Sequence, residues 1–100
     1  MKDQYPRLLV DEREDDGKVL EVIFDTIENQ VRDGEPPEVA ATLARLQAEG
    51  HSREQALRYI ACALSVEFFE ILEHGARFDG ERYADNLAAL PALPYDEDAI

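Results

Sequence analysis

The sequence predicts an all-α fold: a compact bundle of about four helices with a long central third helix and flexible acidic tails. Apolar residues recur three and four apart through most of the chain, as they do in helices that bury one face. Glycine, proline and capping side chains separate these apolar segments. No stretch of useful length alternates as a half-buried strand does, and only Tyr5–Val10 is a candidate for an extended segment.

The first two helices are predicted over residues 18–33 and 36–49. The apolar face of the first comprises Leu20, Ile23, Phe24, Ile27 and Val31, and Gly34 follows its end. Pro36 and Pro37 suit the first turn of the second helix, where an amide proton has no partner. The buried stripe of the second helix is predicted to be Val39, Leu43 and Leu46, and Gly50 is a suitable stop.

The third helix is predicted to run from a capping box at Ser52 and Gln55 to a stop at Gly75. It has two apolar faces. One holds Leu57, Ile60, Ala61, Leu64, Phe68, Ile71 and Leu72, and the other holds Tyr59, Cys62, Val66 and Phe69. A helix that is apolar on two sides is usually buried on both, so this helix is predicted to be central, or its second face to be an interface.

The fourth helix is predicted over residues 80–90, with Asp79 as its cap and with Phe78 and Tyr83 at the positions of a hydrophobic staple. Its apolar residues Tyr83, Leu87 and Leu90 could cover the second face of the third helix. The alternative is a two-fold dimer through Tyr59, Cys62, Val66 and Phe69, and the sequence slightly favours the dimer.

Composition and charge divide the chain into an acidic, mostly flexible segment at 1–16, a helical domain at 17–90 and a tail at 91–100. The net charge is −13, from 23 acidic and 10 basic residues. Such a charge repels nucleic-acid phosphates and anionic membranes, so neither is an expected partner. The single cysteine, Cys62, and the lack of a secretion signal or long apolar run favour a cytoplasmic protein.

A narrow strip on the third helix, Glu67, Glu70 and His74, is a weak candidate metal site. The first helix adds Glu21, Asp25 and Glu28 in a similar stripe. Neither histidine follows a glutamate by three residues, and no two histidines lie four apart, so the usual helical ligand spacings are missing. We therefore expect no metal, no cofactor and no catalytic residues, with the strip as a solvated edge.

Three short motifs resemble a family of small bacterial helical domains of unknown function. They are Glu28-Asn29-Gln30, Pro36-Pro37 and the turn Ala48-Glu49-Gly50-x-Ser52-Arg53, within a stretch from Ile27 to Leu72. The resemblance implies a helical fold. It also implies histidines where this chain has Leu20, Phe24, Glu54 and Arg58. These departures count against a metal function, and Glu54 and Arg58 could instead form an ion pair.

These observations favour a non-catalytic module for protein interaction or self-association, with a protein partner or a second copy as its ligand. Two alternatives stay open. One is a small metal-dependent or acid–base enzyme that uses the carboxylates of the third helix and His74. The other is an acidic mimic of DNA or an antitoxin-like inhibitor, which only the charge supports.

Overall fold

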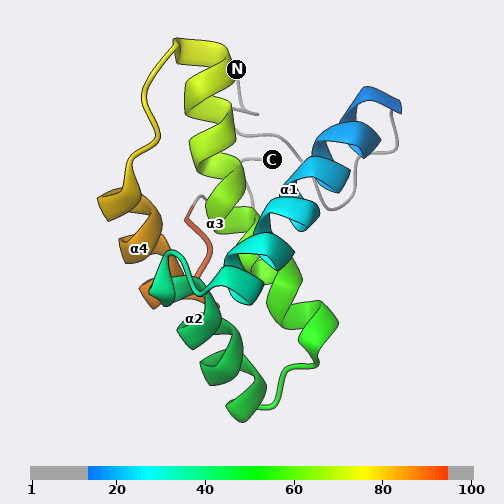
Figure 1. Cartoon of the computed structure of the whole chain (residues 1–100), viewed down its shortest axis with the longest axis vertical. Coiled ribbons are helices and arrows are strands. Elements are labelled where there is room, and N and C mark those ends of the chain that lie inside the picture. The colour runs from blue at the N-terminus through cyan, green and yellow to red at the C-terminus, as the bar shows by residue number, and fades with distance from the viewer. Residues whose placement is uncertain (1–13, 95–100) are drawn as a thin grey trace.

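The structure is a computed structural model, and it describes residues 14–94. These residues form four helices: α1 (Glu14–Asp33), α2 (Pro37–Ala48), α3 (Arg53–His74) and α4 (Gly80–Ala89). The described part of the chain contains no strand (Figure 1). The predicted all-α fold with a long third helix is therefore confirmed. None of the helices in this range is long and apolar enough to cross a membrane.

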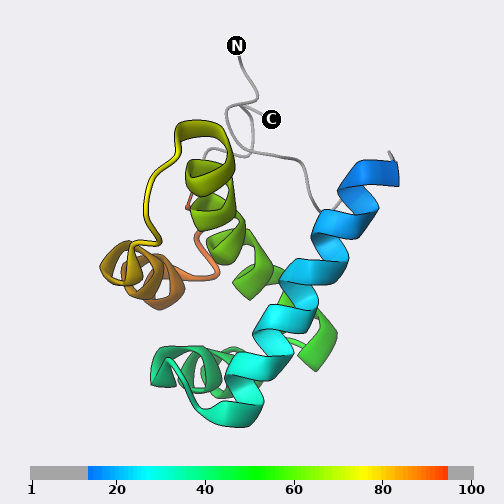
Figure 2. The same ribbon diagram turned by 45° about the horizontal axis from the view of Figure 1, so that its top comes forward.

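The third helix is the centre of the bundle. It packs against α1, α2 and α4, whereas α1 and α4 do not pack against each other within the described range. Figure 2 shows α1 and α4 on different sides of α3, and α2 packs against all three of the other helices. The main core consists of Ile23, Ile27, Val39, Leu43, Leu46, Ala56, Leu57, Ile60, Ala61, Ala63, Leu64, Tyr83, Leu87 and Leu90. The predicted stripe of α2 and the apolar residues of α4 thus lie inside.

The ends of α3 and α4 follow the local signals of the sequence. The amide of Gln55 donates to the Ser52 hydroxyl at 3.1 Å, and the Ser52 amide donates to Gln55 Oε1 at 3.0 Å. Gly75 ends α3 in the left-handed region at φ 62°. The Asp79 carboxylate accepts from the amide of Arg82 at 3.0 Å. The capping box, the glycine stop and the cap of α4 are confirmed.

Two features differ from the prediction. α1 begins at Glu14 rather than Lys18, because an acidic run is favoured in the first turn of a helix, where the macrodipole is positive. The other difference is at the far end of α3. Ile71 and Leu72, predicted as core residues, are 37% and 70% exposed. Residues 1–13 and 95–100 of the predicted flexible segments lie outside the described residues.

The exposure of Ile71 and Leu72 follows from the lengths and directions of the helices. α3 has 22 residues and therefore spans about 33 Å, much more than the 12 residues of α2 or the 10 of α4. In both ribbon views the last turns of α3 diverge from the first turns of α1 (Figures 1 and 2). The final turns of α3 therefore extend beyond the part of the helix that α1, α2 and α4 cover.

Candidate functional site

The acidic strip of α3 does not come together as one site. Glu67 is fully buried, Glu70 is half-buried and His74 is exposed. The imidazole of His74 packs edge-on against Phe69, with ring centroids 5.4 Å apart. Across residues 14–94, no three side chains of histidine, cysteine, aspartate or glutamate lie close enough to hold a metal ion.

Glu67 instead forms an ion pair that joins α3 to α4, in which the carboxylate is buried and Arg82 is partly exposed. Arg82 donates from Nε to Oε2 at 2.7 Å and from Nη2 to Oε1 at 3.0 Å. The amide of Asp79 donates to Oε1 at 2.8 Å. The hydrogen bond with Glu67 raises the pKa of the Arg82 guanidinium further above its ordinary value. Three donors thus occupy the two carboxylate oxygens, as expected for a buried charge that is retained in a fold.

This arrangement gives Glu67 a structural role. Its carboxylate joins the middle of α3 to the first turn of α4 and also accepts from the loop amide that precedes that turn. A carboxylate engaged in this way has little capacity left for a metal ion or for proton transfer. The predicted strip therefore loses its first ligand, and the expectation that Glu67 lies on a solvated edge is wrong.

The acidic residues of α1 do not form one site either. Glu28 accepts two hydrogen bonds from Arg53 at the start of α3, at 2.9 and 3.1 Å. This hydrogen bonding is the main reason why the pKa of the Glu28 carboxyl is lowered. Glu21 and Asp25 are exposed. The stripe on α1 is thus a helix surface with one interhelical ion pair.

The second apolar face of α3 lies mostly inside a single chain. Cys62 and Val66 are each 3% exposed, and Tyr59 and Phe69 are half-buried. Tyr83, Leu87 and Leu90 of α4 are also buried. Cys62 and Val66 therefore present almost no surface to a partner, and the structure favours the packed alternative over a dimer at these two positions.

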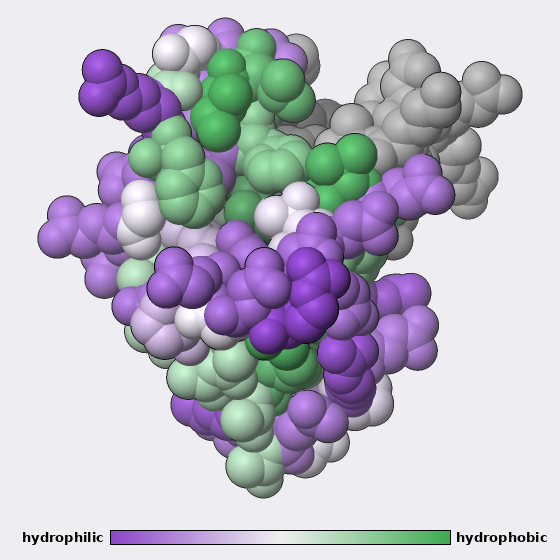
Figure 3. Space-filling model, in the orientation of Figure 1, coloured by the Kyte–Doolittle hydropathy of each residue, from purple (hydrophilic) through white to green (hydrophobic). Residues whose placement is uncertain are grey.

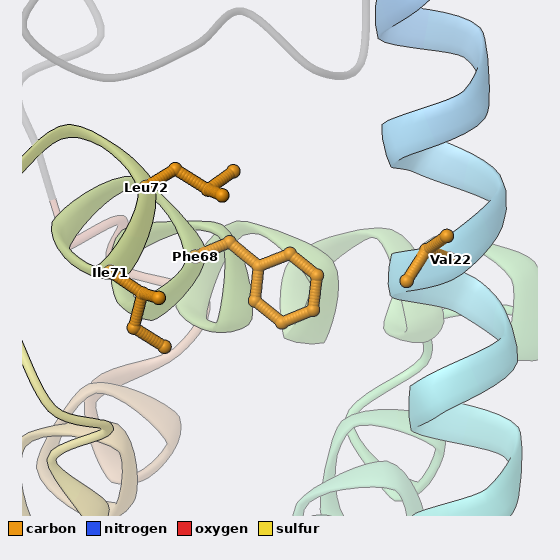
Figure 4. A pocket seen from close by; sticks show the side chains of 4 residues that line it. All are labelled: Val22, Phe68, Ile71 and Leu72. Atoms are coloured by element: carbon orange, nitrogen blue, oxygen red, sulfur yellow. The ribbon is translucent and has the colours of Figure 1, made fainter. Parts of the chain in front are cut away.

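An apolar pocket lies elsewhere, between the first half of α1 and the last turns of α3. Its lining consists of Val22 from α1 and Phe68, Ile71 and Leu72 from α3. Figure 4 shows the Phe68 ring pointing across the gap toward Val22, with Leu72 and Ile71 on either side of it. The pocket has a volume of about 370 Å³ and opens to solvent. It forms where the two helices diverge.

The surface around this pocket combines apolar and acidic groups. Figure 3 shows hydrophobic side chains over the upper half of α3 and, across from them, on α1. Val22 is 52% exposed. Exposed carboxylates lie near the lining residues in sequence: Glu21 directly before Val22, Asp25 three residues after it, and Glu73 directly after Leu72. A pocket of this size and lining can accept bulky apolar side chains, and its lining carries no group suited to acid–base or nucleophilic chemistry.

Sequence patterns indicated three of the four lining residues but assigned them to the core. Phe68, Ile71 and Leu72 belong to the predicted first face of the third helix, and only Phe68 packs against the core. Val22 was missed, because it lies off the apolar face of α1. The sequence indicated it only as an apolar residue that does not follow the helical spacing of Leu20, Ile23 and Ile27.

The motifs behind the family resemblance have structural roles here. Glu28 and Arg53 pair with each other, and Gln30 accepts a hydrogen bond of 2.9 Å from the Tyr83 hydroxyl. Glu54 and Arg58 lie 3.9 Å apart as the expected ion pair. Comparison with protein-family models, curated proteins and solved structures finds no match to this chain. The resemblance therefore stays a prediction.

Proposed function

We propose that this protein is a non-catalytic interaction module that binds a short apolar segment of a protein partner in the pocket between α1 and α3. The observation that carries this proposal is the open, wholly apolar lining of Val22, Phe68, Ile71 and Leu72. Exposed apolar side chains that gather at one place on an otherwise acidic chain are typical of binding surfaces.

The charge of the chain indicates what kind of segment the pocket would bind. The whole chain carries a net charge of −13, and exposed carboxylates lie near the lining residues in sequence, at Glu21, Asp25 and Glu73. A segment with lysine or arginine beside its apolar residues is attracted by this field, and an acidic segment is repelled. The expected ligand is therefore a short peptide with bulky apolar residues flanked by basic ones.

Selection from a displayed library of random 12-residue peptides tests this function. We expect the full chain to enrich peptides that combine bulky apolar and basic residues, and we expect those peptides to lose binding to Leu72→Glu. The matched control is Ala41→Glu, which adds the same charge at an exposed position of α2. Binding that is unchanged by Leu72→Glu, or no enrichment over that variant, would contradict the proposal.

The metal-dependent enzyme and the DNA mimic predict different results. An enzyme of the first kind would carry about one equivalent of zinc, iron or manganese by elemental analysis, and a chelator would lower its thermal midpoint. A DNA mimic would bind a basic protein with strong salt dependence, and Leu72→Glu would not weaken that binding. The interaction module predicts neither pattern.

A further inference from the structure

We propose that residues 5–10 of this same chain, Tyr-Pro-Arg-Leu-Leu-Val, occupy the pocket between α1 and α3 until a partner displaces them. This inference concerns the site of the proposed function. Its displacement step rests on that function, whereas the occupancy itself does not. The segment lies outside the described residues, so the argument uses its composition, its tether to α1 and the shape of the pocket.

The pocket is too small for a second folded copy. A stable interface between two proteins buries about 800 Å² per partner and involves about 20–30 residues on each side. Here four side chains form the lining, and Cys62 and Val66 on the neighbouring part of α3 are buried. Two copies that each carry a charge of −13 also repel each other. A short, uncharged or basic segment fits this surface better than a globular partner.

Residues 5–10 have the composition that the pocket requires. They include four bulky apolar residues, Tyr5, Leu8, Leu9 and Val10, and their single charge is the cationic Arg7. Arg7 suits the acidic surface of the chain, which includes the exposed carboxylates of Glu21, Asp25 and Glu73 near the lining residues in sequence. The other undescribed segment, residues 95–100, reads Tyr-Asp-Glu-Asp-Ala-Ile, and its three acids would be repelled by the same carboxylates.

The tether to α1 places this segment within reach. α1 begins at Glu14, and Val22 lies eight residues further, about 12 Å along the helix. The chain from Val10 to Glu14 spans at most about 14 Å when it is fully extended. The segment can therefore turn back beside α1 and bring its apolar residues level with Val22. Because the tether is short, its effective concentration at the pocket is in the millimolar range, which compensates for a small contact.

Occupancy by the chain's own segment regulates access. A partner peptide has to compete with a tethered ligand, so its apparent affinity is reduced by the fraction of pockets that are open. A partner that also binds residues 5–10 elsewhere would remove this competition.

Paramagnetic relaxation in the full chain tests the occupancy. A nitroxide is attached at the thiol introduced by Asp3→Cys, since Cys62 is buried. We expect the label to broaden the methyl signals of Val22 and Leu72. Dilution with unlabelled chains should leave this broadening unchanged if it arises within one chain. Leu8→Glu/Leu9→Glu should abolish the broadening, whereas the matched pair Ala41→Glu/Ala44→Glu, at exposed positions of α2, should leave it unchanged.

The outcomes separate the two proposals. No broadening at Val22 and Leu72, or broadening that arises only between chains, overturns the occupancy. Peptides whose binding depends on Leu72 should bind the Leu8→Glu/Leu9→Glu variant about tenfold more tightly than they bind the parent chain. Equal affinity for the two chains would also overturn the occupancy. If broadening is seen but neither chain selects peptides, the proposed function fails and the occupancy stands.

Discussion

The hydroxyl of Tyr83 donates a hydrogen bond of 2.9 Å to Oε1 of Gln30 and thereby joins α4 to α1, two helices whose backbones do not pack against each other. The Tyr83 ring is 1% exposed and meets the Phe78 ring edge-on at 5.6 Å. This residue therefore connects the hydrophobic staple of α4 to the far side of the bundle.

Tyr83→Phe should remove this link and keep the packing of the ring. We expect the free energy of unfolding to fall by about 1 kcal/mol at neutral pH, the usual contribution of one intramolecular hydrogen bond. Urea denaturation followed by circular dichroism measures the change. Tyr83→Leu, which also loses the ring contact, is the control and should cost more. An unchanged midpoint for Tyr83→Phe would contradict a stabilising role for the bond.

Alkaline pH gives a second test of the same residue. Burial, followed by the negative charge of Glu67, raises the pKa of the Tyr83 hydroxyl above its ordinary value. The folded protein then retains a proton that the unfolded chain loses near pH 10, so stability is complete below about pH 10 and declines as the pH rises further. Relative to Tyr83→Phe, the parent chain should lose up to about 1.4 kcal/mol per pH unit in this range. Parallel pH profiles would show that the hydroxyl is not buried.

The ion pair between Glu28 and Arg53 predicts the opposite pH dependence. Hydrogen bonding to Arg53 lowers the pKa of Glu28, so its contribution is present above about pH 4.3 and is lost as the pH falls through the lower folded value. Both side chains are about half exposed, which limits the effect to about 0.5 kcal/mol. Glu28→Gln should therefore lower the unfolding midpoint at pH 7, and this effect should diminish as the pH falls below about 4.3. Glu21→Gln, an exposed carboxylate on the same helix, should have no such effect.

Removal of Arg82 should destabilise the protein more than neutralisation of its partner. Arg82→Met leaves the buried Glu67 carboxylate without its cation and should cost about 3 kcal/mol or more. Glu67→Gln keeps an acceptor for the Asp79 amide, and Arg82, whose side chain is 37% exposed, can reach water. Equal penalties for the two variants, measured by urea denaturation, would argue against this asymmetry.

The middle and the last turns of α3 should respond differently to an introduced charge. Val66→Glu places a carboxylate where the native side chain is 3% exposed, and we expect this variant to unfold. Leu72→Glu changes a residue that is 70% exposed and should stay folded, with a change within about 0.5 kcal/mol. Circular dichroism distinguishes the two. A folded Val66→Glu chain that becomes smaller by light scattering would restore the dimer through this face.

The helices and their ends could be predicted because their signals are local. Ser52 lies three residues before Gln55, and Asp79 lies three residues before Arg82, so each cap is formed within one turn. The spacing of Val39, Leu43 and Leu46 likewise predicts a buried face whatever covers it. Such patterns need no knowledge of the neighbouring helix.

The candidate site could not be predicted in the same way, because it depends on how helices diverge. The exposure of Leu72 results from α3 extending beyond its neighbours. No local pattern distinguishes it from the buried Leu64, which lies eight residues earlier on the same face. The burial of Glu67 depends on Arg82, 15 residues later in the chain. A glutamate between two apolar faces was the available signal, and it was interpreted as a solvated edge.

The pairing of Glu67 with Arg82 also constrains how this sequence can vary among homologous proteins. A change at either position alone leaves a charge or a backbone amide without its partner. Replacing both residues with apolar ones of similar volume is often tolerated. Positions 67 and 82 should therefore change together, as acidic with basic or as two uncharged residues. This covariation gives a signature by which distant members of the same lineage can be recognised where overall similarity has faded.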